Sequence, residues 1–153
     1  MLTIREIFDV GANDVEFLRS VDLRKRKRWL ATVVAMANSK GGVIFFGVES
    51  DENVVGCDKN PDLIPFIKNS IASEIQPAVE YNVFEYSLNF NDKNVLVLSV
   101  QEGALKPYYY LGDSIKKVFI RVDGATKFAH SSDFHALKPR VTRYGRDQRN
   151  PMK

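Results

Sequence analysis

The sequence predicts an α+β fold: a single domain with a mixed β-sheet packed by three to four helices. Its 153 residues, 44% of them hydrophobic, are sufficient for one hydrophobic core that needs no metal or disulfide. Apolar residues recur at helical spacing in one segment and form continuous or alternating runs in several others. The order of these helical and extended segments is that of an α+β protein.

The first elements are a short helix, a strand and a long helix. Thr3–Val10 is predicted to be helical, because Thr3 and Glu6 have the spacing of a capping box. Val15–Leu18 is a short strand candidate. Lys25–Ser39 is the clearest helix, since its apolar residues follow the helical period: Trp29, Leu30, Val33, Val34 and Ala37.

A buried strand and a second helix follow. Gly41 and Gly42 end the long helix, and Val43–Val48 is a fully apolar run typical of the centre of a sheet. Val54–Gly56 is predicted to be a short strand. Pro61–Ile75 is the second long helix, with Pro65 in its first turn.

The second half is mostly extended. Val79–Leu88 and Asn94–Val100 are predicted to form a hairpin, and the second strand is apolar on both faces. Lys117–Val122 is a further strand, and Ser131–Leu137 is predicted to be a short helix. Strand alternation buries either Tyr109 or both of its tyrosine neighbours, so we expect Tyr108–Tyr110 to pack in the core.

The charges are unevenly distributed. The net charge is +3, but residues 138–153 hold six Lys and Arg against one Asp, which leaves residues 1–137 weakly acidic. We therefore predict a domain over residues 1–138 and a basic, flexible tail over residues 139–153. A second basic segment precedes the apolar positions of the long helix, with five consecutive cations: Arg24, Lys25, Arg26, Lys27 and Arg28.

Both basic segments are suited to phosphate groups. The tail arginines recur every third residue, at Arg140, Arg143, Arg146 and Arg149. The alternative for the first segment is a solvated helix face, and for the tail a disordered solvating segment. Cations at the start of a helix oppose its dipole, however, and acidic side chains are the ones favoured there. An unfavourable placement of this kind favours a functional role.

Several function classes are not favoured. Cys57 is the only cysteine, and His130 and His135 are five residues apart, so neither a disulfide nor a metal site is expected. No apolar run reaches the ~20 residues of a membrane helix, and the N-terminus is too charged for a signal peptide. We expect a cytoplasmic protein (nuclear if the source is eukaryotic) without a membrane partner and without a cofactor.

One stretch carries the strongest motif. Asn38, Gly41 and Gly42 lie where the long helix turns into the buried strand, and Gly47 follows in that strand. With these residues the sequence resembles the Schlafen AlbA-type domain family, over about residues 12–138. The other elements of the resemblance are Val15-Glu16-Phe17, Val55-Gly56, Ile75-x-Pro77, Lys106-Pro107-Tyr108, Phe119-Ile120-Arg121-Val122 and Gly124-Ala125-Thr126.

The resemblance implies an α/β sandwich-like domain that binds nucleic acid in bacterial regulators and in Schlafen proteins. Some relatives cleave RNA with three carboxylates that hold Mg²⁺ or Mn²⁺. Of these positions, Glu16 is retained, Gly11 replaces the second carboxylate and Ser50 the third, with Glu49 and Asp51 beside it. Catalysis by Glu16 with Glu49 or Asp51, and a need for Mg²⁺ or Mn²⁺, is therefore an alternative and not the main expectation.

The main prediction is a regulatory nucleic-acid-binding domain, for DNA or RNA, with weak sequence preference. The residues expected to contact phosphates are Arg24–Arg28, Lys40, Arg121 and the four tail arginines. For Arg121, an ion pair with Asp123 or Glu49 is an equal alternative. Besides the endoribonuclease, a third hypothesis is a partner-dependent subunit, acting as a homodimer or in a complex with another protein.

Overall fold

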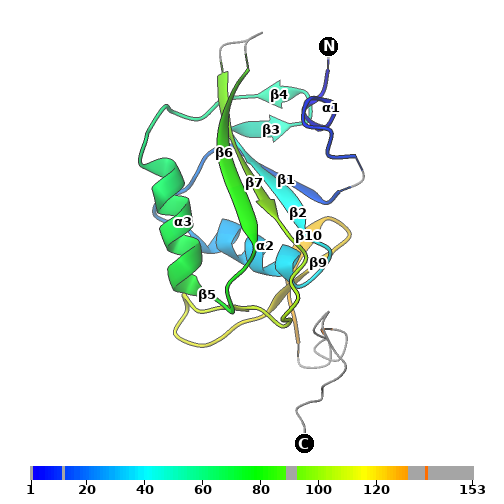
Figure 1. Cartoon of the computed structure of the whole chain (residues 1–153), viewed down its shortest axis with the longest axis vertical. Coiled ribbons are helices and arrows are strands. Elements are labelled where there is room, and N and C mark those ends of the chain that lie inside the picture. Colours follow the sequence, from blue (N-terminus) through cyan, green and yellow to red (C-terminus); the bar gives the residue numbers. More distant parts are fainter. Residues whose placement is uncertain (1, 12, 89–92, 131–136, 138–153) are drawn as a thin grey trace, which may run out of the picture.

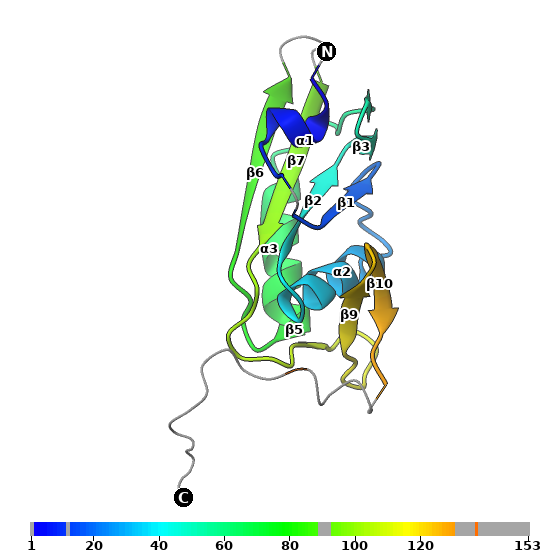
Figure 2. The same ribbon diagram turned by 90° about the vertical axis from the view of Figure 1, so that its right-hand side faces the viewer.

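A mixed four-stranded sheet forms the centre of the computed structural model, which describes residues 2–11, 13–88, 93–130 and 137. The strand order is β1 (Val15–Leu18), β2 (Gly42–Phe46), β7 (Lys93–Val100) and β6 (Tyr81–Leu88). β1 is parallel to β2, whereas β2, β7 and β6 are successively antiparallel. Figure 2 shows the four strands in this order. The predicted α+β class and mixed sheet are confirmed.

Helix α2 (Lys27–Ala37) connects the parallel strands β1 and β2. Its residues from Trp29 to Ala37 are all buried, because the helix packs between the sheet and later segments of the chain. Helix α3 (Leu63–Glu74) packs into the same core, beside α2 (Figure 1). The sequence pattern that predicted α2 therefore marked the most buried helix of the described chain.

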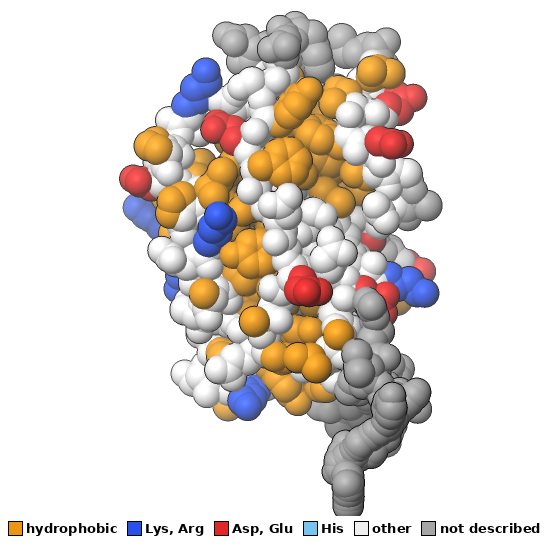
Figure 3. All heavy atoms as spheres, in the orientation of Figure 1, with side chains coloured by type: hydrophobic (Ala, Val, Ile, Leu, Met, Phe, Trp, Pro, Cys, Tyr) orange, Lys and Arg blue, Asp and Glu red, His pale blue; other side chains and the backbone are white. Residues whose placement is uncertain are grey.

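The other face of the sheet holds a smaller core. Helix α1 (Ile4–Ile7) covers part of this face with Ile4, and its predicted capping box between Thr3 and Glu6 is present. Phe84 and Tyr86 of β6 remain 38% and 43% exposed. Figure 3 shows hydrophobic side chains gathered on the face over β6 and α1.

Three short strand pairs complete the described fold: β3 (Val48–Ser50) with β4 (Asn53–Val54), β5 (Ile75–Gln76) with β8 (Tyr109–Tyr110), and β9 (Phe119–Val122) with β10 (Ala125–Phe128). The β9–β10 hairpin lies against α2 (Figure 2). Tyr108 and Tyr110 are buried, as the alternation predicted. β5, β8 and β10 were not predicted.

Two predicted boundaries are corrected. The strand expected over Val43–Val48 is broken at Gly47, which has a φ of +92° and donates its N–H to the Leu18 carbonyl. The helix expected from Lys25 begins at Lys27, because the Asp22 carboxylate accepts the N–H groups of Arg24 and Lys25 and holds them in a turn. The helix predicted at Ser131–Leu137 lies almost wholly outside the described residues.

Candidate functional site

The five cations at the start of α2 separate into two groups. Arg26 and Lys27 form ion pairs: Arg26 Nη2 lies 2.7 Å from Glu74 Oε2, and Lys27 Nζ lies 2.5 Å from Asp113 Oδ2. The hydrogen bond to Asp113 raises the pKa of Lys27. These two side chains attach the start of α2 to the end of α3 and to the loop before β9.

Arg24, Lys25 and Arg28 form the second group. All three side chains are exposed, and none forms an ion pair with another described residue. The nearby Asp22 carboxylate accepts the backbone N–H groups of Lys25 and Arg24, which lowers its pKa. The three side chains are therefore positioned by ordered backbone, and their charges are available to a partner.

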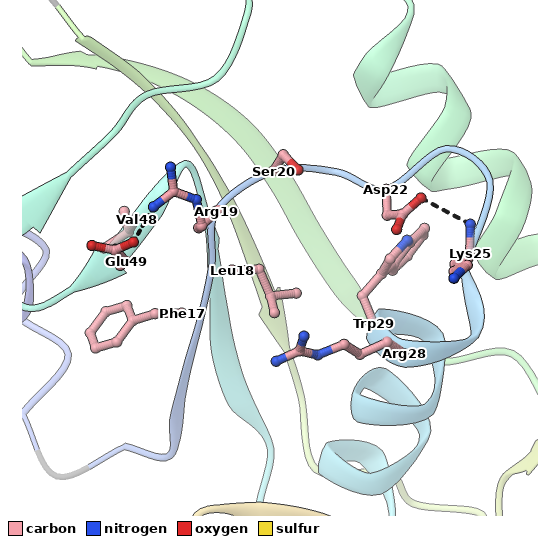
Figure 4. A pocket seen from close by; sticks show the side chains of 10 residues that line it. All are labelled: Phe17, Leu18, Arg19, Ser20, Asp22, Lys25, Arg28, Trp29, Val48 and Glu49. Carbon is pink, nitrogen blue, oxygen red and sulfur yellow. Dashed lines mark hydrogen bonds and ion pairs between the residues drawn. The ribbon is translucent and has the colours of Figure 1, made fainter.

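A hollow of about 440 Å³ adjoins these free cations. It lies at the carboxyl end of β1, between that strand, the beginning of β3 and the start of α2 (Figure 4). In a parallel strand–helix–strand unit, this end of the strands is where ligands bind. Its lining residues are Phe17, Leu18, Arg19, Ser20, Asp22, Lys25, Arg28, Trp29, Val48 and Glu49.

Two further hollows continue from the first along α2. The second, of about 490 Å³, shares Arg28 with the first and lies between α2 and the β9–β10 hairpin. The third, of about 460 Å³, shares Gly124 with the second and contains Lys40. We call these three adjoining hollows the α2 track. It brings Arg28, Lys27 and Lys40 onto one surface beside a helix of eleven residues, or about 16 Å.

Arg121 has a different environment from the one expected. Its side chain is only 4% exposed, and its Nε and Nη2 donate to Asp14 at 2.6 and 2.8 Å. Its Nη1 donates to Glu16 at 3.0 Å. The expected pairing with Asp123 or Glu49 is wrong, because Arg121 points from β9 toward β1 while Asp123 stands in the hairpin turn with a φ of +52°.

The Arg121 network neutralises two of the carboxylates that line the track. Desolvation opposes the charge of Arg121, but the hydrogen bonds that it donates to Asp14 and Glu16 outweigh this effect, and the pKa of Arg121 is raised. Asp14 and Glu16 line the third and second hollows, respectively. Their pairing with a cation reduces the repulsion that they would exert on an anionic ligand.

The candidate catalytic carboxylates are not gathered. Glu16 pairs with Arg121, Glu49 with Arg19, and Asp51 with Arg5. Glu16 lines the second hollow and Glu49 the first. No group of three or more His, Cys, Asp or Glu residues in the described part of the chain could hold a metal ion. With glycine and serine at the other two ligand positions, these residues do not fit the Mg²⁺ or Mn²⁺ site that RNA cleavage requires.

The turn motif has a structural role. Asn38 is buried at the end of α2, and its Nδ2 donates to the carbonyls of Tyr108 and Phe119, both at 3.0 Å. Its Oδ1 accepts the Tyr108 N–H at 2.7 Å. Gly41, with a φ of +77°, leaves no room for a side chain, since a Cβ would lie 2.6 Å from the Val100 carbonyl oxygen. Gly42 is similarly confined by Met36.

Sequence reasoning missed the walls of the first hollow. The sequence pattern indicates Trp29, Phe17 and Leu18 as core and strand residues and does not single out Arg19. The available signal was positional, because Arg19 and Ser20 directly follow β1, at the strand end where a parallel unit places ligands. The tail arginines Arg140, Arg143, Arg146 and Arg149 lie outside the described residues, so their role stays a prediction.

The fold and the site define an α+β domain with a parallel strand–helix–strand unit and a polar track beside the connecting helix. The family model described as Schlafen, AlbA_2 matches residues 12–129. The chain therefore belongs to the Schlafen AlbA_2 family. No curated protein matches it.

A solved structure supports the fold. The N-terminal domain of a RecG-related protein from Nitrosomonas europaea, determined by NMR in solution, superposes with a TM-score of 0.55 and 24% identity. The match covers 80% of this chain and 86% of that domain. In the described part of the chain, no helix is both long and apolar enough to cross a membrane.

Proposed function

We propose that this domain binds nucleic acid by contacting the phosphate backbone along the α2 track. The observation that carries the proposal is the group of three exposed cations, Arg24, Lys25 and Arg28, which have no ion-pair partner among the described residues. Membership of the Schlafen AlbA_2 family supports it. DNA and RNA present the same phosphates, so the proposal covers both.

The geometry favours an extended polyanion over a single small anion. Arg28 lines the first two hollows, and Lys40 lines the third, at the opposite end of α2. A helix of about 16 Å separates these ends, a span of several phosphates along a duplex strand. Contacts to phosphates carry no base information, and sequence preference is therefore weak.

The remaining cations have positioning roles in this proposal. Arg26 and Lys27 are held by Glu74 and Asp113, and Arg121 is held by Asp14 and Glu16. These ion pairs fix the beginning of α2 and the β9–β10 hairpin, between which the second hollow lies. The contacting set is thus Arg24, Lys25, Arg28 and Lys40, together with the tail arginines.

The test is fluorescence anisotropy with labelled oligonucleotides at two salt concentrations. We expect binding that weakens steeply with salt, and the triple variant Arg24→Gln, Lys25→Gln, Arg28→Gln should lower the slope of log K against log salt by roughly 2 to 3. A matched control removes three exposed lysines elsewhere: Lys59→Gln, Lys68→Gln, Lys116→Gln. The proposal fails if nothing binds at low salt or if the two triple variants behave alike.

A further inference from the structure

We infer that the first hollow of the α2 track accommodates one unpaired nucleotide, so that the domain prefers single-stranded nucleic acid to a duplex. This inference rests on the proposed function and specifies its ligand. The hollow, the chemistry of its walls and one unpartnered indole N–H carry it.

The walls of the hollow combine two chemistries. Phe17, Leu18 and Val48 supply apolar surface, and Lys25 and Arg28 supply positive charge. Arg19 is paired with Glu49, and Asp22 adds a carboxylate to the wall. A free phosphate would leave the apolar wall without a contact, and an apolar ligand would leave the cations without an anionic partner. A nucleotide has both a flat base and a charged phosphate, and a volume of about 440 Å³ is within the range of small-ligand sites.

Trp29 provides the second observation. Its side chain is 1% exposed and packs edge-on against Phe46 at 5.9 Å, which fixes the ring. Its Nε1 has no hydrogen-bond partner among the described residues. Figure 4 shows Trp29 with Asp22, Lys25 and Arg28 at the same end of the hollow.

An unpartnered buried donor is unfavourable, because the N–H has lost its bonds to water. Nε1 itself is enclosed, so an oxygen of a ligand in the hollow would accept this hydrogen bond only after the side chains around the indole shift. Base carbonyls and phosphate oxygens are both such acceptors, so a nucleotide in the hollow would satisfy the indole N–H as well as the surrounding cations.

The nucleotide must be unpaired because a paired base lies inside a stack. Inserting it into a protein cavity from a duplex requires breaking its pair and its stacking, whereas a single strand can turn a base outward at low cost. In the proposed arrangement, the flanking phosphates remain beside Lys25 and Arg28 at the rim of the hollow.

Trp29 also makes the inference measurable, because it is the only tryptophan in the chain. We would follow its fluorescence while titrating the 153-residue chain with a single-stranded 12-mer, as DNA and as RNA, and with a hairpin duplex of the same bases. Single strands should bind at least tenfold more tightly and change the tryptophan signal, while the duplex should leave the signal unaltered. A difference between the DNA and RNA arms would identify the sugar that is preferred.

A cavity-filling variant completes the test. Ser20 is exposed at the rim, so Ser20→Phe should block the hollow without affecting the core. Ser73→Phe, on the exposed side of α3, is the matched control. We expect Ser20→Phe to abolish the single-strand preference and the tryptophan signal but to preserve duplex binding.

The outcomes separate the two proposals. If single strands and duplex bind equally, or if Ser20→Phe retains the preference, the inference is overturned while the proposed phosphate contact stands. If no oligonucleotide binds at low salt, the proposed function fails and this inference fails with it.

Discussion

Asn38 shows how one buried polar side chain can determine the local fold. Its amide group bonds to the backbone of Tyr108 and Phe119, two segments that are distant from the end of α2 in the sequence. Three backbone groups would lose their partner if this amide were removed. The motif that identified the family is therefore a structural centre, not a contact surface.

We predict that Asn38→Ala lowers the free energy of unfolding by about 2–4 kcal/mol, because it leaves buried carbonyl and N–H groups unsatisfied. Urea denaturation measures this change. Asn13→Ala replaces an exposed asparagine and should change stability by less than about 0.5 kcal/mol. Equal effects of the two substitutions would show that the hydrogen bonds of Asn38 contribute little.

At the residue scale, the sequence predicted where a residue lies in an element better than it predicted which distant residues it contacts. It correctly placed Asn38, Gly41 and Gly42 at the turn, since a helix end needs glycine and a capping side chain nearby in the chain. It could not find the partners of Arg121, because Asp14 and Glu16 are 107 and 105 residues away. Such pairs depend on tertiary packing that local patterns do not encode.

At the scale of elements, the long strands, β1 and α2 were predictable, whereas β5, β8 and β10 were not. β6 and β7 have eight residues each, and their hydrophobic patterns are clear without knowledge of the fold. β5 and β8 have two residues each and exist only because the chain brings Gln76 beside Tyr109. Gly47 likewise interrupts an apolar run, at a positive φ and so close to Cys57 that an added Cβ would lie 2.9 Å from its backbone nitrogen.

The β9–β10 hairpin is an element held by Arg121. We predict that Arg121→Met destabilises the protein by about 2–4 kcal/mol, since Asp14 and Glu16 would keep their charges in partly buried positions without a cation. Thermal or urea unfolding measures the loss. Arg121→Lys should recover only part of it, because a lysine cannot make the paired contact to Asp14. Full recovery by lysine would contradict the role assigned to the guanidinium geometry.

The ion pair that holds Lys27, at the start of α2, to Asp113 should contribute a stabilisation that depends on pH. The hydrogen bonds from Lys27 and Lys117 lower the pKa of Asp113 below its ordinary value of 3.8. Because the folded-state pKa is the lower one, this stabilisation is complete above pH 3.8 and is lost as the pH falls through the folded-state pKa.

We therefore predict that Asp113→Asn reduces stability at neutral pH and that its difference from the wild type shrinks in strong acid. Urea denaturation at about pH 6 and at about pH 2 makes the comparison. Asp58→Asn, in an exposed loop position, serves as the control. A difference that is independent of pH would exclude the ion pairs as its cause.

At the scale of the whole molecule, the basic segments are divided between the folded domain and the tail predicted for residues 139–153. The net charge of +3 conceals this division. We predict that deleting residues 140–153, which include four arginines, lowers the salt slope of nucleic-acid binding by about 3, at 0.7–0.9 per phosphate contact. Its effect on the urea midpoint should be small, and a large loss of stability would instead assign these residues to the domain.

The burial of α2 has a mechanical consequence. Nine successive residues of this helix are enclosed by the core, so the helix can neither bend nor slide without breaking the packing around it. The charged groups at its two ends are thus mounted on a stiff spacer of constant length. A spacer of constant length makes binding depend on the distance between the anionic groups of the ligand. A polymer whose groups are stretched or compressed away from that distance would bind weakly, whatever its chemical composition.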